Sequence, residues 1–507
     1  MKETNKNLSK NRGEKTKRAR SEIATILPKE SSRKNKKEPK KRLELVIFVI
    51  FAVVIAVALL LGGANGTGNT SLSNNINDAD VNWNAYEGTQ ITLSGTGKTL
   101  IENAGVYTVT GELVDGYIEI NSLGAVKLIL DGVTIKNSSG PAIYVAEADM
   151  VTIELAKDSN NVLMDASVYR GWDEDVCGVL FSHDDLVLQG EGTLTVEANY
   201  EDGIVGKDNL KINSGTYIVN AKDEGIRGRD SIYIVDGNFE ITSGGDALKA
   251  NNSDEVGKGW VKIDGGAISA TADDDGIHAE SSLEINGGTI QITKSYEGIE
   301  AAKITINGGD ISIVAIDDGI NAAGGNDSSS PNMGRYQQSS NNYAVFINGG
   351  RLYIESSGDG IDSNGTIHIN DGIVIVDGPT NNGNGALDSE TGIIYNGGSV
   401  IAVGASGMAT APNETSEKYS ISIFFALTYD AGTVLEVYDD HGNAILKHTS
   451  LKSFQHASLS SDSFEEGETY YIYVDDVRYT TVVLSGKTTQ VGQSNTMMPG
   501  GRPGQPF

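Results

Sequence analysis

The amino-acid sequence predicts an all-β protein whose main part is a parallel β-helix, a stack of similar coils of about 22 residues each. Three observations support this fold class. An acidic residue followed by Gly and an aliphatic residue returns at intervals from Asp202 to Asp359. The short runs between these returns alternate apolar and polar residues, as strands with one buried face do. Asn-Gly-Gly turns also recur, for example at Asn286 and Asn307.

The N-terminal end predicts a membrane anchor. Residues 1–43 contain 16 Lys or Arg and 5 Asp or Glu, whereas the rest of the chain contains 23 basic and 63 acidic residues. Between the two lies an uncharged apolar run of 20 residues, Leu45–Ala64, which is about what one helix needs to cross a bilayer. We therefore predict a single transmembrane helix over residues 44–64, with the basic segment in the cytoplasm and the acidic remainder outside the cell. A cleaved signal peptide is the alternative, although the run is longer than the usual signal core.

The basic segment lies beside the predicted membrane helix, and membrane topology explains its charge. We therefore expect no nucleic-acid binding. The chain has one cysteine, Cys177, which excludes an internal disulfide, and we expect it to be a small buried apolar residue.

The rest of the chain divides into four parts. Residues 65–80 are polar and without periodicity, which predicts a linker, and the β-helix is expected over residues 81–411. Residues 412–487 contain longer alternating runs and the hairpin sequence DDHGN, which predicts a small C-terminal antiparallel β domain that caps the coils. Residues 488–507 end in a stretch rich in Gly and Pro and are expected to form a disordered tail.

The acidic-Gly-aliphatic unit defines the length of one coil. Its glycine position returns after 22, 22, 29, 22, 21, 41 and 26 residues, so the basic repeat is 22 and the longer steps contain polar insertions. Within one unit Leu283, Ile285, Ile290, Ile292 and Ile299 alternate with polar residues, which predicts three short strands per coil. A meander of hairpins does not explain the fixed return. Coils stacked about 4.8 Å apart would instead bury the aliphatic residues in one narrow core.

Glycine at a fixed turn of every coil is expected to supply a positive φ, and the Asn or Asp before it to bond to the backbone of its own turn. For the Asn-Gly-Gly turns this explanation is sufficient.

The acidic residue that begins each unit requires more. We name these residues the acidic column: Asp202, Glu224, Asp246, Asp275, Glu297, Asp318 and Asp359. Stacked coils would bring their carboxylates within about 5 Å of one another, where like charges repel unless screened. Ca²⁺ takes about six to eight oxygen ligands and would remove this repulsion, with turn geometry alone as the alternative. The predicted calcium ligands are the acidic column and its neighbours Asp274 and Asp317.

The residue three positions after each acidic corner forms a second series, which we name the +3 row. It changes from basic to acidic along the chain, in the order Val205, Arg227, Lys249, His278, Glu300, Asn321, Asp362 and Asp388. On successive coils Arg227, Arg229 and Lys249, together with Lys207, would form a cationic patch suited to carboxylated ligands. Alternatively, they would neutralise the acidic residues near them, and both explanations stay open. His278 is expected to be a hydrogen-bonded turn residue, with a role as a ligand as the alternative.

Several segments together resemble a known family: DGVTIKNSSGPAIYV, HDDLVLQGEGTLTVEANYEDGI, the DDGI and NGG coils, ISIFFALTYDAGTVLEVYDDHGN and the GGRPG tail. Over about residues 80–507 the chain resembles the clostridial carbohydrate-binding domain-containing proteins. The resemblance implies a right-handed parallel β-helix like that of polysaccharide lyases, bound Ca²⁺, and binding to cellulose and to acidic sugars such as polygalacturonate. It implies no established lyase activity. Asp275, Glu297, Asp318 and Asp359 match the coil motif of the family.

Three functions compete. We favour a monomeric, single-pass cell-surface protein that binds cellulose or an acidic polysaccharide and is stabilised by Ca²⁺. A calcium-dependent polysaccharide lyase is the second, with Lys249 and Arg227 as the catalytic residues, although carboxylates on every coil are too regular to mark one catalytic pair. A structural adhesin is the third. The candidate carbohydrate-binding residues are Lys207, Arg227, Arg229, Lys249 and, because aromatic faces stack on sugars, Trp260 and Tyr296.

Overall fold

The computed structural model describes residue 72, residues 76–323 and residues 343–493. The basic segment 1–43, the predicted helix Leu45–Ala64 and most of the predicted C-terminal tail lie outside the described residues. Within the described ranges, the structure has no helix with the length and apolar character needed to cross a membrane. The described residues from Ile76 on belong to one compact unit.

The coils are preceded by two short 3-10 helices, η2 (Asp78–Asp80) and η3 (Trp83–Ala85), and the described part of the chain contains no α-helix. Asp78 falls in the predicted linker 65–80, but its carboxylate forms an ion pair with Lys127 of the coils at 3.1 Å. The end of the predicted linker therefore packs against the coils, because Asp78 finds a partner far along the chain.

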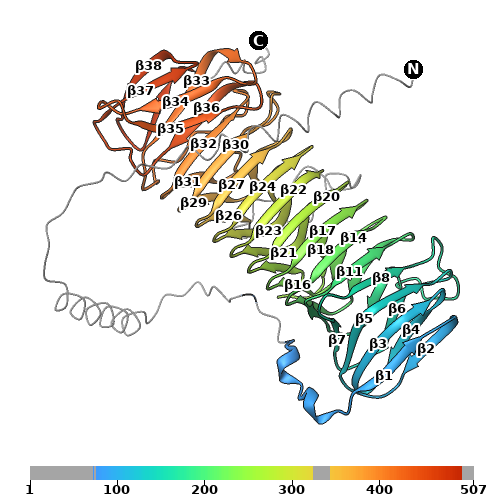
Figure 1. The fold of residues 1–507 in the computed structure, drawn as a ribbon. Helices are drawn as coiled ribbons and strands as arrows, with labels where there is room; N and C mark the ends of the chain where they lie inside the picture. The colour runs from blue at the N-terminus through green and yellow to red at the C-terminus, as the bar shows by residue number, and fades with distance from the viewer. Residues whose placement is uncertain (1–71, 73–75, 324–342, 494–507) are drawn as a thin grey trace, which may run out of the picture. The chain divides into compact units, whose positions relative to one another are not determined.

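Strands pair in parallel with their equivalents one coil later, in three series that follow the chain from its N-terminal to its C-terminal coils (Figure 1). The first series, which carries the +3 row, consists of β2 (Thr96–Ile101), β4 (Asp115–Asn121), β6 (Ile143–Glu147), β9 (Gly178–Ser182), β12 (Asp202–Gly206), β15 (Ile226–Gly228), β18 (Leu248–Ala250), the starts of β21 (Ile277–Ile285) and β23 (Ile299–Ile306), β25 (Ile320–Ala322) and β28 (Ile361–Ser363). The second series consists of β1 (Thr89–Leu93), the starts of β3 (Gly105–Leu113) and β5 (Val126–Lys136), β7 (Val151–Leu155), β10 (Leu186–Gly190), β13 (Asn209–Ile212), β16 (Ser231–Ile234), β19 (Trp260–Ile263), the ends of β21 and β23, β26 (Ala344–Ile347), β29 (Thr366–Ile369) and β31 (Gly392–Tyr395). The third consists of the ends of β3 and β5, β8 (Asn160–Met164), β11 (Thr193–Glu197), β14 (Thr216–Asn220), β17 (Asn238–Ser243), β20 (Ala267–Ala272), β22 (Thr289–Ser295), β24 (Asp310–Ala315), β27 (Arg351–Glu355), β30 (Ile373–Asp377) and β32 (Ser399–Gly404).

The register of these pairs agrees with the sequence repeat. In the first series Ile226 lies opposite Ile204 on one side and Leu248 on the other. Equivalent aliphatic residues are buried together in one continuous core: Ile204, Ile226, Leu248, Ile277, Ile299, Ile320, Ile361 and Leu387. The protein is thus all-β with a large, mostly parallel sheet, an arrangement consistent with the predicted β-helix; its right-handed sense stays a prediction.

Two glycine positions recur in the coils for different reasons. The second Gly of the Asn-Gly-Gly turns has the predicted positive φ, +93° at Gly288 and +100° at Gly309. The Gly after the acidic column is not among the residues with positive φ, so that prediction is wrong there. At Gly298 a Cβ atom would lie 2.2 Å from the carbonyl oxygen of Gly319 on the next coil. Gly occupies this turn because the backbones of neighbouring coils approach too closely for a side chain.

The Asn residues of the Asn-Gly-Gly turns bond to one another from coil to coil. Nδ2 of Asn307 donates to Oδ1 of Asn286 at 2.7 Å, and Nδ2 of Asn348 donates to Oδ1 of Asn307 at 2.7 Å. Asn370 and Asn396 continue the series. The expected bond from these side chains to their own turn is thus replaced by an Asn ladder, in which stacking supplies a partner at every step.

The C-terminal strands extend the coil sheet and add a second one. The extension consists of β33 (Ser420–Tyr429), β36 (Phe454–Ser460) and β39 (Thr488–Val491), and the second sheet of β34 (Val434–Tyr438), β35 (Ala444–Thr449), β37 (Thr469–Val474) and β38 (Val477–Val483). Strand β36 pairs antiparallel with the last coil strand, β32, and with β33. Because β39 pairs with β33, the predicted tail 488–507 begins with an ordered strand.

Candidate functional site

The acidic column and the +3 row lie next to each other on the first strand series. The backbone N–H of Gly276 donates to the carbonyl of Glu297 at 3.0 Å, and that of Gly298 donates to the carbonyl of Asp318 at 2.9 Å. Members of the +3 row are opposite each other in register, for example His278 and Glu300. Since residues alternate along a strand, the +3 row points away from the core residues beside it. The structure therefore brings together the two series that the sequence repeat predicts.

Aspartates of the acidic column accept hydrogen bonds from the backbone of the next coil, a role that the sequence did not indicate. Oδ1 of Asp246 accepts the backbone N–H of Asp275 at 2.8 Å, and Oδ1 of Asp275 accepts that of Glu297 at 3.2 Å. Asp202, Asp318 and Asp359 accept from the next coil in the same way. One carboxylate oxygen thus satisfies a donor of the following turn, which leaves the second oxygen in need of a partner.

In the first half of the column, basic residues of the +3 row supply that partner. Arg227 lies 2.8 Å from Oδ2 of Asp202, and Lys249 lies 2.7 Å from Oδ2 of Asp246 and 2.9 Å from Oε1 of Glu224. The three carboxylates are buried, so each cation offsets a charge that water does not reach. Of the two explanations left open for Arg227 and Lys249, neutralisation is the one these contacts support.

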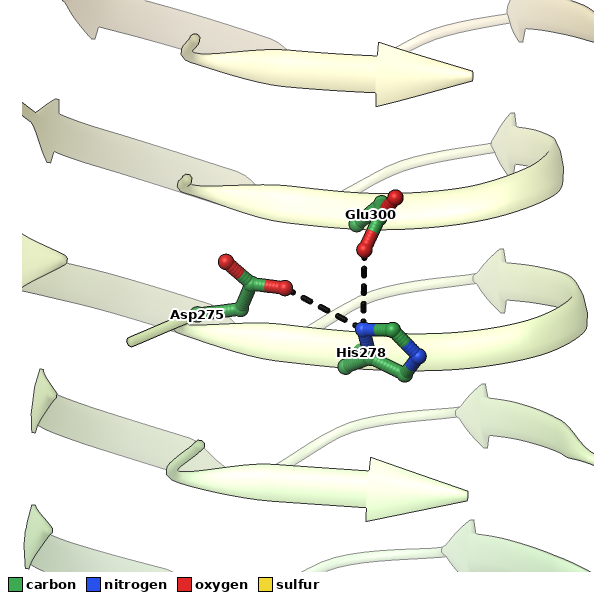
Figure 2. A group of neighbouring side chains, drawn as sticks. All are labelled: Asp275, His278 and Glu300. Atoms are coloured by element: carbon green, nitrogen blue, oxygen red, sulfur yellow. Dashed lines mark hydrogen bonds and ion pairs between the residues drawn. The ribbon is translucent and has the colours of Figure 1, made fainter. Parts of the chain in front are cut away.

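His278 continues the series on the next coil. Its Nδ1 lies 3.1 Å from Oδ2 of Asp275 on its own coil and 2.9 Å from Oε2 of Glu300 on the following one (Figure 2). All three side chains are buried. Although burial lowers the pKa of His278, the carboxylates of Asp275, Glu280 and Glu300 close to its ring raise it to about 12. His278 is hydrogen-bonded to Asp275, as expected, but it lies in strand β21 and not in a turn.

In the part of the chain that the structure describes, the second half of the column has no basic partner. In the described ranges, no Lys, Arg or His forms an ion pair with Asp318, Asp359 or Asp362. Burial, followed by the charges of neighbouring carboxylates, raises the pKa of Asp318 to about 8 and that of Asp362 to about 7. Glu297 accepts two hydrogen bonds from the amide of Asn321, yet burial and nearby carboxylates raise its pKa to about 10. In this half of the site the described side chains do not offset the charge of the carboxylates, so their ionisation is unfavourable and their pKa values rise.

Oxygen atoms in this half fit a hard divalent cation. Asp359, Asp362 and Asp388 each offer a carboxylate oxygen within 4.8 Å of the others. The Oδ1 of Asn321, which lies in register between Glu300 and Asp362 of the +3 row, is buried without a hydrogen-bond partner. An all-oxygen group with uncompensated charge has the composition that Ca²⁺ prefers. The clusters Asp202–Asp223–Glu224 and Asp246–Asp274–Asp275 differ, because Arg227 and Lys249 already offset part of their charge.

The remaining predicted binding residues are dispersed. Trp260 is buried, with 5% of its surface exposed, so it presents no face to a sugar. Tyr296 is 39% exposed beside the acidic column. Lys207 lies 3.6 Å from Asp175, and Arg229 pairs with Asp230, so neither is a free cation.

The structure adds an aromatic group, which we name the aromatic platform: Tyr117, Tyr144 and Trp172. The indole of Trp172 packs edge-on against both tyrosines, with ring centroids 5.1 and 5.0 Å apart. Tyr144 lies opposite Phe181, which lies opposite Val205, so the platform continues the +3 row toward the N-terminus. The strand that contains Tyr144 could be predicted from its alternating apolar and polar residues. Trp172 could not, because it lies in a loop between β8 and β9 that is outside the repeat.

Comparisons with known proteins agree with the predicted resemblance. A family model described as carbohydrate-binding domain-containing protein matches residues 94–340. A protein of Acetivibrio thermocellus with the same description is 34% identical over 186 residues, which cover 34% of this chain and 65% of the relative. The chain therefore matches slightly less than two thirds of that relative's length. A solved structure of a polysaccharide lyase-like protein from C. thermocellum, a gadolinium derivative, is 34% identical, covers 44% of this chain and 84% of its own, and has a TM-score of 0.36.

Proposed function

Because residues 94–340 match the model of a family described as carbohydrate-binding domain-containing protein, we propose that the chain binds a polysaccharide at the cell surface. The anchor in this proposal is Leu45–Ala64, and the polymer is cellulose or an acidic glycan such as polygalacturonate. The family match carries the proposal, since it covers the aromatic platform and the +3 row as far as Asn321.

The aromatic platform is the part of the surface best suited to a sugar ring. Trp172 and Tyr144 are half-buried, so each keeps some ring surface accessible while its contacts hold it in place. Sugar rings have apolar faces that pack on aromatic side chains, and rigid aromatic residues lose little entropy on binding. The next two positions along the strand stack, Phe181 and Val205, are buried, so the sugar ring in this proposal rests on the platform itself.

An acidic polymer would require a bridging cation. The chain has a net charge of −29, and Arg227 and Lys249 are engaged with internal carboxylates. A Ca²⁺ ion held by Asp359, Asp362 and Asp388 would have coordination positions left for a uronate carboxylate, because Ca²⁺ takes about six to eight ligands. In this proposal calcium stabilises the coils and also binds the acidic glycan.

The contacts of Lys249 favour binding over cleavage. A lyase needs a base that takes a proton from the sugar. The ion pairs of Lys249 with Asp246 and Glu224 raise its pKa further above its usual value, despite the opposing effect of burial. A lysine that stays protonated is a poor general base, so the lyase is not the function we propose.

The test uses the full chain in a detergent that keeps the predicted helix in solution. Retention on polygalacturonate and on cellulose is measured by affinity electrophoresis and pull-down, with millimolar calcium or with EDTA. Absorbance of unsaturated product is recorded in parallel. Trp172→Ala should weaken binding at least about tenfold, whereas Trp83→Ala, which removes an indole outside the +3 row, should not.

A second variant distinguishes stacking from folding. A Cβ on Gly140 would lie 2.0 Å from Nε1 of Trp172, so Gly140→Ala should displace the indole while it remains in the chain, and binding should weaken. If both polymers retain Trp172→Ala as strongly as the wild type, the aromatic platform is not the sugar-binding surface. Unsaturated product that disappears with Lys249→Ala would favour the lyase. If neither polymer retains the protein, the structural adhesin becomes the favoured function.

A further inference from the structure

The group Asp275, His278 and Glu300 differs from every other acidic group along the acidic column because it includes a nitrogen ligand. Among the six histidines of the chain, all of which are described, His278 alone has a ring nitrogen within 3.1 Å of two carboxylates. The three side chains come from two neighbouring coils, and their ligand atoms lie within 4.8 Å of one another. Figure 2 shows the imidazole turned so that Nδ1 faces both carboxylates.

A single proton on Nδ1 cannot give hydrogen bonds of good geometry to both carboxylates. Nδ1 is 3.1 Å from Asp275 and 2.9 Å from Glu300, but a single N–H donates one good hydrogen bond. The bond goes to Asp275, and Oε2 of Glu300 is left without a hydrogen-bond partner. Glu300 is 1% exposed, so water does not complete the site, and a buried carboxylate oxygen in this state is costly.

The other ring nitrogen, Nε2, lies where a metal-bound histidine usually makes a supporting hydrogen bond. Nε2 of His278 is buried and lacks a hydrogen-bond partner, and the nearest carboxylate is Glu280, whose Oε1 lies 3.9 Å away. Histidines that bind metals through one nitrogen usually donate the other N–H to a carboxylate, a carbonyl or a water. Glu280 is half-buried, so a small movement of its side chain or one bridging water would complete that contact.

We propose that Asp275, His278 and Glu300 form a site for one divalent transition metal of the Zn²⁺ class, distinct from the calcium site proposed at Asp359, Asp362 and Asp388. A tetrahedral ion with bonds of about 2.0–2.1 Å separates its ligand atoms by about 3.3 Å, close to the 2.9 and 3.1 Å between Nδ1 and the two carboxylates. Imidazole nitrogen favours zinc, cobalt and nickel, whereas calcium selects oxygen. Three protein ligands leave the fourth position to water or to a ligand oxygen.

This inference does not depend on sugar binding. Its competitor is a permanent imidazolium, in which His278 would act as a third fixed cation after Arg227 and Lys249. The two alternatives differ in whether the site takes up a metal, and in whether the uptake depends on the imidazole and on Glu280.

The experiment adds Co²⁺ to the full chain, prepared without a polyhistidine tag and stripped with EDTA, in the presence of millimolar calcium that fills the oxygen sites. We expect one equivalent of Co²⁺ with the visible absorption of a tetrahedral ion, displaced by Zn²⁺. His278→Gln should abolish this absorption. His368→Gln, the same change at a histidine stacked on Phe346, should leave it unchanged. Glu280→Gln should weaken Co²⁺ binding by about 10- to 100-fold.

Glu300→Gln guards against a folding defect in the histidine variant, because it keeps the imidazole and removes one carboxylate ligand. It too should reduce Co²⁺ affinity, while its far-ultraviolet circular dichroism stays that of the wild type. Absence of Co²⁺ uptake by the wild type, or uptake that His278→Gln leaves unchanged, would overturn the proposal in favour of the imidazolium. If the wild type takes up Co²⁺ but binds no polysaccharide, the proposed function is wrong and the metal site is not affected.

Discussion

Replacing Asp362 by Asn tests whether a cation holds the acidic half of the column. Burial, and then the charges of Asp359 and Asp388, raise the pKa of Asp362 to about 7, whereas an Asp in an unfolded chain titrates near 3.9. The folded state therefore binds the proton more tightly, and without metal the free energy of unfolding falls as the pH rises from about 4 to about 7. About three pKa units correspond to at most about 4 kcal/mol, less the screening of a partly exposed carboxylate.

We therefore expect opposite effects of Asp362→Asn with and without calcium. In EDTA at pH 8 the variant should be more stable than the wild type by about 2–4 kcal/mol, because it removes an uncompensated charge without a change of shape. In millimolar calcium it should be less stable, because an amide oxygen replaces a charged ligand. Urea denaturation in both buffers measures the difference, with Asp131→Asn, an exposed carboxylate, as the control. Stabilisation of equal size in both buffers would refute the cation site.

Three further predictions concern stability. Gly298→Ala should cost about 1–3 kcal/mol or more, because its Cβ would lie 2.2 Å from the carbonyl oxygen of Gly319; thermal denaturation against Gly88→Ala, where a Cβ meets nothing within 4 Å, checks this. Arg227→Met should cost about 3–5 kcal/mol in urea denaturation, because it leaves Asp202 buried without its counter-charge; a cost below about 1 kcal/mol would contradict that ion pair. EDTA should lower the Tm of the wild type by a few degrees relative to millimolar calcium, because ions bound only to the folded state stabilise by mass action; coincident melting curves would remove calcium from the proposal.

The repeat in the sequence was sufficient to predict which residues lie beside each other. A fixed return of about 22 residues, together with alternation, specifies parallel stacking, and pairs such as Ile277 with Ile299 follow directly. The role of the glycines could be predicted only in part. Sequence alone does not separate a Gly needed for its φ, as at Gly288, from one needed because a neighbouring coil is too close, as at Gly298. Both appear in the sequence as a glycine at a turn.

The candidate site was harder to predict, because it depends on directions of side chains between coils. The +3 row showed a change from basic to acidic, but not that Arg227 reaches back to Asp202 on the preceding coil. Nor does spacing show that an Asp uses one oxygen to accept the backbone N–H of the next turn. The aromatic platform depends on Trp172, whose loop interrupts the repeat and packs on strands that are distant in sequence.

The way in which charge is offset along the acidic column explains why a metal would be needed at only some of its coils. Every Asp in the column has one oxygen occupied by the following turn, so the second oxygen requires a cation or a donor. Arg227 and Lys249 supply it on two successive coils, and the row then continues through His278, Glu300, Asn321 and Asp362. If the repeat were uniform, each corner would need an ion of its own. Among the described residues, fixed cations pair with the column at one end and none does at the other, so an external ion, as we propose, would be needed where the row becomes acidic. Such an ion would keep coordination positions open to a ligand from solution.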